Sequence, residues 1–175
     1  DDVRDINSLK KAIKEFKPDF VFHLAAQPLV RFSYEKPIYT WETNVMGTIN
    51  ILESIKSLNK NCTGVFITTD KVYKNNEWIY GYRENDELGG YDPYSSSKAA
   101  CEIAISSWRS SFDNQTTYSK SSFSLATARA GNVIGGGDWS QNRIIPDVIK
   151  CLRNNEKIKI RNPKSTRPWQ HVLEP

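Results

Sequence analysis

Long apolar runs and clusters of basic residues are both missing from this 175-residue chain. No apolar run approaches the ~20 residues that a membrane-spanning helix requires. The net charge of +4 suits a small anionic ligand, but without a run of Lys or Arg it predicts binding to neither nucleic acid nor membrane. The opening residues, Asp1-Asp2-Val3-Arg4, are acidic and do not form a secretory signal.

Cysteine and histidine are scarce as well. Cys62, Cys101 and Cys151 are odd in number and widely spaced, so they indicate neither a disulfide framework nor a metal site. We expect three reduced thiols in a cytoplasmic protein that binds no metal. His23 and His171 are isolated, and the apolar residues around His23 indicate a core histidine rather than a ligand.

Apolar strands alternate with amphipathic helices along most of the chain. Strands are predicted at 20–24, 65–68 and 124–130, and helices at 37–55, 94–111 and 144–152. Strands separated by helices favour right-handed crossovers and a parallel sheet, which predicts a doubly wound, Rossmann-like α/β fold. The unbroken hydrophobicity of 20–24 predicts a sheet that is covered on both faces.

Smaller elements are predicted around this framework. Asn7 or Ser8 is expected to cap a first helix. That helix carries three apolar side chains on one face: Leu9, Ile13 and Phe16. A short strand is predicted at 158–160, an exposed excursion at 113–122, and a functional loop at 70–93, where Asn, Gly, Tyr and charged residues are frequent.

Three small or polar residues follow predicted strand ends: Ala25, Thr69 and Asn132. In parallel sheets ligands bind beyond the carboxyl ends of the strands. We therefore expect these three positions to converge on a binding site at one edge of the sheet.

Tyr94 and Lys98 are four residues apart on a predicted helix, so they share a face. A nearby ammonium favours the phenolate form of a tyrosine, which can accept a proton from a sugar hydroxyl while hydride leaves the same carbon. Such a pair by itself is common on helix surfaces. Thr69, a hydroxyl at a strand end, favours the catalytic interpretation because it can orient the substrate alcohol.

Asp70 and Lys71 follow Thr69 directly. A carboxyl that burial keeps protonated could donate a proton to a departing hydroxyl, and a neutral amine could remove a carbon-bound proton. A salt bridge within a turn is the alternative interpretation of the same pair.

Asn132, Arg143 and Arg167 are polar donors in or near predicted loops, and guanidinium groups suit diphosphate oxygens. A solvated surface charge is the alternative for each arginine. The glycines at 135–137 lack the spacing of a dinucleotide-binding fingerprint and do not open a first βα turn. We expect them to form a loop across the substrate cleft.

Taken jointly, several motifs cover almost the whole chain, at 23–31, 43–48, 69–71, 80–85, 94–98, 129–139, 161–163 and 167–172. With them the chain resembles the extended short-chain dehydrogenase/reductase family, and within it the nucleotide-sugar 4,6-dehydratases. The resemblance implies NAD as cofactor, a homodimer, and a catalytic set of Thr69, Asp70, Lys71, Tyr94 and Lys98. Glutamate stands at the position of Lys71 in relatives that use dTDP-glucose, which favours CDP-glucose as the substrate and leaves the base at C5 open.

The resemblance also implies contacts with cofactor and substrate. Asp2 and Val3 would lie at the adenine, Ala25 and Ala26 at the ribose and nicotinamide, with Tyr94 and Lys98 beside them. Asn132, Arg143 and Arg167 would hold the substrate's nucleotide and diphosphate, and Thr69 its sugar.

Domain boundaries follow from the same resemblance. Residues 1–131 would form an NAD-binding domain without its glycine-rich first turn, and 132–175 the start of a substrate-binding lobe. We therefore expect a segment of a longer enzyme, inactive alone. Two other functions stay open. A nucleotide-sugar 4-epimerase would use Tyr94 and Lys98 but needs no acid beside Thr69. A non-catalytic NAD-binding regulator would not need the hydroxyl, the phenol and the lysine together.

Overall fold

The computed structural model describes residues 2–58, 60–112 and 123–174. The contacts divide the chain into two compact units, Asp1–Arg129 and Ala130–Pro175, and each unit is described by itself. The excursion predicted at 113–122 lies outside the described residues. Within the described ranges, no helix has the length and the apolar character that crossing a membrane would require.

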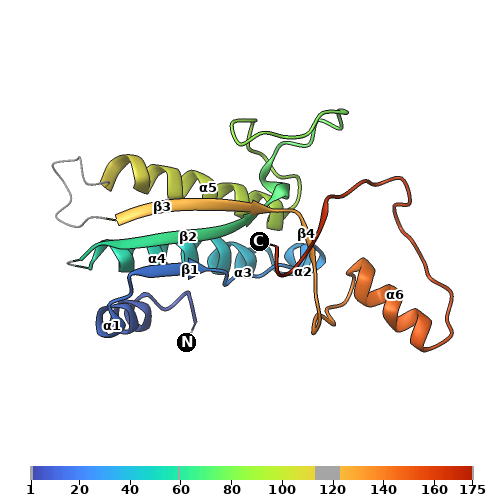
Figure 1. Ribbon diagram of the computed structural model, residues 1–175, viewed down its shortest axis with the longest axis horizontal. Helices are drawn as coiled ribbons and strands as arrows, with labels where there is room; N and C mark the ends of the chain where they lie inside the picture. The colour runs from blue at the N-terminus through green and yellow to red at the C-terminus, as the bar shows by residue number, and fades with distance from the viewer. Residues whose placement is uncertain (1, 59, 113–122, 175) are drawn as a thin grey trace. The chain divides into compact units, whose positions relative to one another are not determined.

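The first unit is built on a three-stranded sheet in the order β1-β2-β3. Its strands are β1 (Phe20–His23), β2 (Cys62–Thr69) and β3 (Phe123–Ala130). β1 and β2 are parallel, with Phe20 opposite Thr63 and His23 opposite Phe66. The arrow of β3 runs in the same direction (Figure 1), so the carboxyl ends of all three strands meet at one edge. The predicted α/β fold with a parallel sheet is confirmed.

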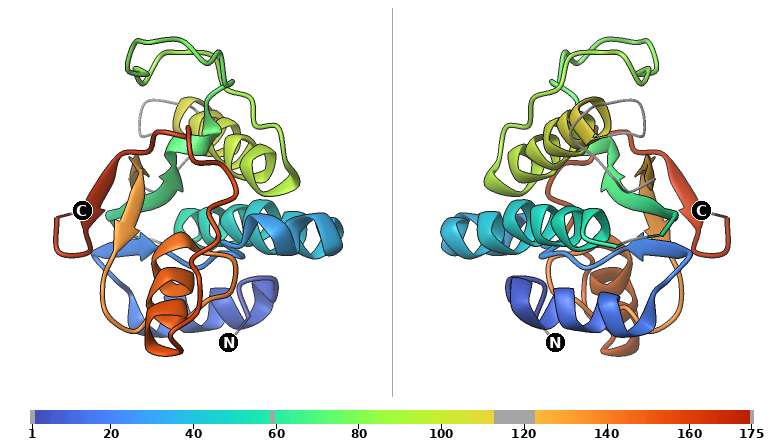
Figure 2. Two further views of the ribbon diagram at one scale, coloured as in Figure 1. Left: turned by 90° about the vertical axis from the view of Figure 1, so that its right-hand side faces the viewer. Right: turned by 90° about the vertical axis from the view of Figure 1, so that its left-hand side faces the viewer.

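Among the described residues, one α-helix precedes these strands and four α-helices connect them. They are α1 (Ile6–Phe16), α2 (Val30–Glu35), α3 (Pro37–Trp41), α4 (Gly47–Lys56) and α5 (Pro93–Phe112). α4 and α5 lie on the same face of the sheet (Figure 2), and α1 packs against α4. Because both crossovers cover the same face, the core forms between that face and these helices.

The core is a single cluster of buried apolar side chains. Leu52 and Ile55 of α4, Ile105 of α5 and Phe66 of β2 belong to this cluster, and each is at most 1% exposed. Leu9 and Ile13 of α1 pack against this cluster from outside, as their spacing predicts, together with Val21, Val45, Trp108, Phe112 and Leu125. Helical steps of three and four residues account for this inner face.

The second face of the sheet departs from the prediction. Phe20 and Phe22 of β1 are 64% and 65% exposed. The expectation of a sheet covered on both faces is therefore wrong for the described part of the chain. Phe16, expected on the inner face of α1, is the last residue of that helix and is 83% exposed.

The helix boundaries also differ in detail. Asp5, rather than Asn7 or Ser8, caps α1, since its Oδ1 accepts hydrogen bonds from the backbone N–H groups of both residues at 3.0 and 3.2 Å. The predicted helix at 37–55 is continuous but contains a π-helical turn, Glu42–Met46, between α3 and α4. π-Helical turns are frequent at functional sites.

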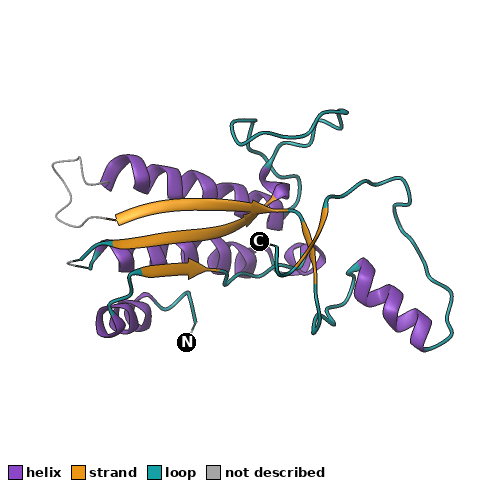
Figure 3. Ribbon diagram, in the orientation of Figure 1, coloured by secondary structure: helices purple, strands orange, loops and turns teal. Residues whose placement is uncertain are grey.

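The second unit contains two short parallel strands and one helix. β4 (Asn132–Ile134) pairs with β5 (Trp169–His171), and α6 (Ile144–Arg153) lies between them in sequence. Figure 3 shows that the segment between α6 and β5 is drawn as loop. The strand predicted at 158–160 is therefore wrong; its two isoleucines are 42% and 44% exposed and face no partner strand. Pairing with β4 instead forms a strand at 169–171.

Candidate active site

The end of β2 brings three predicted catalytic residues into direct contact. The strand stops at Thr69, and a 3₁₀ turn, Asp70–Val72, begins there. The Thr69 hydroxyl donates to Asp70 Oδ1 at 3.1 Å, and Lys71 Nζ lies 3.3 Å from the same oxygen. Thr69 is buried, whereas Asp70 and Lys71 are about a quarter exposed. The carboxylate is therefore bonded by a hydroxyl and by an ammonium at the carboxyl edge of the sheet.

The salt bridge within a turn, which was the alternative interpretation of Asp70 and Lys71, is therefore present in the structure. An ion pair with this much exposure contributes only about 0–1 kcal/mol to stability. Stability therefore explains little of the pair, and its position at the carboxyl edge favours a chemical role.

α5 carries Tyr94 and Lys98 on its first two turns, and both side chains are buried. The backbone N–H of Tyr94 donates to the Ser33 hydroxyl at 3.1 Å, and Ser33 is fully buried. Asp92 accepts from the Ser95 N–H at 3.0 Å and completes the start of the helix. These caps hold the helix end, and with it the tyrosine, in one position.

Lys98 joins the helix to the sheet. Its ammonium donates to the Ile67 carbonyl at 3.1 Å, two residues before Thr69. Burial lowers the pKa of Lys98 below its ordinary value, while Cys101 and Glu102 act in the opposite direction. Within the described residues this is its one hydrogen bond, so two of its three N–H donors remain for a ligand.

His23 is the buried core histidine that the sequence predicts. Its Nε2 lies 3.1 Å from the Thr48 hydroxyl, and its ring meets Phe66 edge to face. Burial and the nearby charge of Lys98 lower its pKa to about 4. The imidazole is therefore neutral at neutral pH, which avoids a second cation beside Lys98.

This histidine predicts a pH dependence of stability. The folded pKa of about 4 lies below the ordinary value of 6.5, so the unfolded chain takes up the proton first as the pH falls. The contribution is fully present above pH 6.5, and about 3 kcal/mol is expected to be lost by pH 4. Urea unfolding of wild type and His23→Gln at both pH values measures it, with the exposed His171→Gln as control. An equal loss in wild type and His23→Gln contradicts the assignment.

A buried polar network ties the loop after β1 to α5. The Asn44 side chain accepts from the Gln27 backbone N–H at 2.8 Å and donates to the Ser97 hydroxyl at 2.9 Å. Ser97 in turn donates to the Tyr94 carbonyl at 2.7 Å. The loop that holds the predicted nicotinamide contact Ala26 is thus fixed relative to Tyr94.

Sequence reasoning missed these network residues. The sequence offered one signal for this network. Asn44 lies within a helix that was predicted from its apolar spacing, and an amide buried in such a helix needs hydrogen-bond partners. Thr43 beside it was missed as well. It is 9% exposed, and its hydroxyl has no hydrogen-bond partner in the described residues. A buried, unpaired hydroxyl in a π-helical turn is a signal that only coordinates provide.

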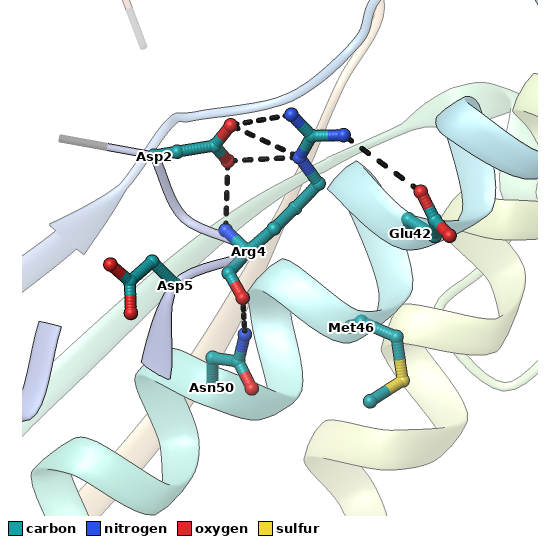
Figure 4. A pocket seen from close by; sticks show the side chains of 6 residues that line it. All are labelled: Asp2, Arg4, Asp5, Glu42, Met46 and Asn50. Atoms are coloured by element: carbon teal, nitrogen blue, oxygen red, sulfur yellow. Dashed lines mark hydrogen bonds and ion pairs between the residues drawn. The ribbon is translucent and has the colours of Figure 1, made fainter. Parts of the chain in front are cut away.

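Asp2, one of the two residues predicted at the adenine, lies at an open pocket of about 530 Å³, shown in Figure 4. Its lining residues are Asp2, Arg4, Asp5, Glu42, Met46 and Asn50. Arg4 forms an ion pair with Asp2 at 2.6 Å, and its hydrogen bonds lower the pKa of Asp2 to about 2. Asn50 donates to the carbonyls of Val3 and Arg4, which fixes this segment on α4.

The remaining predicted substrate contacts belong to the second unit. Asn132 is the first residue of β4, and its N–H donates to the Pro168 carbonyl at 3.0 Å. Arg143 precedes α6 and forms an ion pair with Asp138 at 3.2 Å. Arg167 is exposed shortly before β5. The glycines at 135–137 follow β4 rather than β3 directly.

With this geometry described, the family follows from a direct match. The family model described as GDP-mannose 4,6 dehydratase matches residues 1–174 of the chain. The chain belongs to this family. The predicted resemblance to nucleotide-sugar 4,6-dehydratases is thereby confirmed.

The names of two curated relatives specify different sugar nucleotides. The CDP-glucose 4,6-dehydratase of Salmonella typhimurium (strain LT2) is 56% identical over 99% of the chain and 48% of the relative. The dTDP-D-glucose 4,6-dehydratase of Dictyostelium discoideum is 30% identical over 97% of the chain and 39% of the relative. The chain thus spans less than half the length of each.

Solved structures agree with the fold of this GDP-mannose 4,6 dehydratase family member. A dTDP-glucose 4,6-dehydratase from Streptomyces venezuelae, crystallised with NAD and TYD, matches 98% of the chain with a TM-score of 0.83 at 23% identity. The structure of Pal from Bacillus thuringiensis also matches 98% of the chain, with a TM-score of 0.84 at 24% identity. At these identities the likeness establishes the Rossmann-like fold alone.

Proposed function

We propose that the protein is an NAD-dependent nucleotide-sugar 4,6-dehydratase that converts CDP-glucose to its 4-keto-6-deoxy product. One observation carries the proposal: the Asp70 carboxylate contacts both the Thr69 hydroxyl and the Lys71 ammonium where β2 ends. A dehydration needs an acid beside a base, and oxidation alone does not. The 56% identity to a protein named CDP-glucose 4,6-dehydratase supports the choice of substrate.

The described residues fit a nicotinamide cofactor. Thr43 has a buried hydroxyl without a partner in the described chain, next to the Asn44 that holds the loop after β1. Lys98 keeps two donors that suit ribose hydroxyls. Ala25 and Ala26 carry no side chain large enough to block a ring from the backbone. We propose that these residues hold the nicotinamide end, and that Asp2 and Val3 lie at the adenine.

Bound NAD would supply reversible hydride transfer. The protein's own part in the first step belongs to α5 and β2. In the proposal Thr69 orients the C4 hydroxyl of the sugar, and the Tyr94 phenolate accepts its proton. The buried ammonium of Lys98 favours the phenolate form.

The second step is loss of water, and it needs a proton donor and a proton acceptor. A ketone at C4 acidifies the hydrogen at C5. In the ion pair, Asp70 lacks the proton that it must donate and Lys71 holds the proton that prevents it from acting as a base. Transfer of one proton across the 3.3 Å contact converts both groups to their reactive forms. Lys71 can then remove the C5 proton while Asp70 protonates the departing C6 hydroxyl. Return of the C4 hydride to C6 and of the proton on Lys71 to C5 would complete the 4-keto-6-deoxy product and leave the cofactor oxidised again.

Further parts of the proposal concern the second unit and the assembly. Asn132, Arg143 and Arg167 would bind the nucleotide and diphosphate, because guanidinium groups pair with phosphate oxygens. We propose a cytoplasmic homodimer in which residues 1–131 serve mainly the cofactor and 132–175 mainly the substrate. The guanidinium of Arg143 would exchange its partner Asp138 for a phosphate oxygen when substrate binds.

Incubation with CDP-glucose tests the proposal. The natural protein that contains this chain, supplied with NAD, is expected to convert CDP-glucose to a 4-keto-6-deoxy sugar that is detected by its absorbance in base and by mass spectrometry as the loss of one water. dTDP-glucose is expected to react more slowly. A product with the mass of CDP-glucose and an inverted C4 would identify a 4-epimerase instead, and no product would favour a regulatory role.

A further inference from the structure

Behind the predicted catalytic residues lies a second set of buried polar side chains: Thr68, Glu102 and Arg129. Thr68 directly precedes Thr69 on β2, and Glu102 lies one helical turn beyond Lys98 on α5. Thr68 and Glu102 are each 6% exposed. Arg129 lies near the end of β3. The set therefore joins three elements at the carboxyl end of the sheet.

The contacts within this set use nearly every polar atom. The Thr68 hydroxyl donates to Glu102 Oε1. Arg129 donates to both oxygens of the same carboxylate, from Nε to Oε1 and from Nη2 to Oε2, each at 3.1 Å. This two-pronged pairing fixes orientation as well as distance.

The pair is charged in the folded protein. Burial raises the pKa of Glu102, but hydrogen bonds from Arg129 and Thr68 and the charge of Arg129 outweigh it, so the pKa lies below its ordinary value. The Glu102 carboxylate in turn raises the pKa of Arg129. Buried ion pairs often add no more stability than apolar side chains of the same size. Stability alone therefore does not account for this one.

The hydrogen bonds of Lys98 and Glu102 fix the end of β2 relative to α5. Lys98 holds the Ile67 carbonyl and Glu102 holds the Thr68 hydroxyl, so two consecutive residues of β2 are tied to two consecutive turns of α5. The next residue of the strand is Thr69. Its position relative to the first turn of α5, which carries Tyr94, is thereby set at two points.

Arg129 extends the anchoring to the segment that follows the 3₁₀ turn. Its Nη1 donates to the Glu84 carbonyl at 2.9 Å, and its guanidinium lies 4.9 Å from the centre of the Tyr73 ring. Tyr73 comes two residues after Lys71. One guanidinium thus contacts Glu102 and two positions, Tyr73 and Glu84, in the loop that Asp70 and Lys71 begin.

We propose that Thr68, Glu102 and Arg129 are positioning residues that set the Thr69 hydroxyl and the Asp70 carboxylate against Tyr94. The inference rests on the proposed dehydratase function, and it adds residues that touch neither cofactor nor substrate. Their effect is on turnover, because they orient groups that act in the transition state rather than groups that bind the nucleotide.

Thr68→Val and Thr68→Ser in the natural protein that contains this chain test the proposal. Valine keeps the shape but removes the donor, and kcat for CDP-glucose is expected to fall about 10-fold, the scale of one hydrogen bond to a charged group. KM and the amount of bound NAD are expected to stay at the wild-type values. Serine restores the hydroxyl and is expected to restore kcat. Thr63→Val, on the same strand but away from Glu102, is the matched control.

A structural role alone would change the melting temperature and leave kcat per folded molecule unchanged, which would overturn the proposal. Glu102→Gln is the second variant if Thr68→Val does not fold, and it is expected to lower kcat with NAD still bound. If the wild-type protein converts CDP-glucose and the variants keep its kcat, only the positioning role is overturned. If the wild-type protein does not convert CDP-glucose, both the proposed function and this inference are overturned.

Discussion

Tyr94→Phe is expected to lower kcat for CDP-glucose by about 10²–10⁴-fold, the usual contribution of a positioned acid–base group. The variant removes one oxygen from a side chain that is buried on the first turn of α5. The helix caps from Ser33 and Asp92 contact backbone and are unaffected. NAD is therefore expected to stay bound, because Lys98 and the loop after β1 keep their contacts. Turnover assays and the ratio of bound nucleotide to protein measure the two effects.

Tyr91→Phe is the matched control, because this tyrosine lies three residues earlier and is 98% exposed. It is expected to behave as wild type. Loss of bound NAD in Tyr94→Phe would contradict the proposed role of the phenol and assign Tyr94 to cofactor binding. Unchanged turnover would remove it from the reaction altogether.

Asp70→Asn is expected to stop the loss of water and leave the oxidation at C4 in place. The amide has almost the shape of the carboxyl group and can still accept the hydrogen bond from Thr69, but it cannot donate an acidic proton. kcat for the 4-keto-6-deoxy product is expected to fall about 10²–10⁴-fold. Mixing with CDP-glucose should then raise the absorbance of reduced nicotinamide without release of product, which stopped-flow spectroscopy records.

Asp19→Asn serves as the control for this substitution, since Asp19 is an exposed partner of Lys60 far from Asp70 in sequence. No change is expected there. If Asp70→Asn lost the oxidation and the dehydration equally, Asp70 would belong to the first step. If both were kept, the acid would have to come from another residue.

Much of the framework could be predicted from short-range pattern. The apolar stretches at 65–68 and 124–130 predicted β2 and β3, and the amphipathic pattern at 94–111 predicted α5, whose buried residues include Lys98, Cys101 and Ile105. These patterns succeed because a side chain's burial repeats with the period of its own element. The contiguity of Thr69, Asp70 and Lys71 also made their contact predictable.

The failures have a different physical origin. The strand expected at 158–160 was wrong because a strand needs a partner, and β4 pairs with 169–171 instead. The predicted burial of Phe20 and Phe22 was wrong because a hydrophobic side chain favours burial but does not determine which element packs against it. Asp5 displaced the predicted caps because backbone geometry decides which side chain reaches the first free N–H groups.

The sequence by itself determined the order of strands and helices, the family, and the identity of the residues proposed to react. These depend on local periodicity and on adjacent residues, which a chain carries before it folds. Only the tertiary structure decided that Lys98 and Glu102 hold consecutive residues of β2, that Asn44 joins the loop after β1 to α5, and that Thr43 keeps a buried hydroxyl unpaired among the described residues. Those contacts join residues distant in sequence, and their partners are chosen by packing rather than by any repeating pattern.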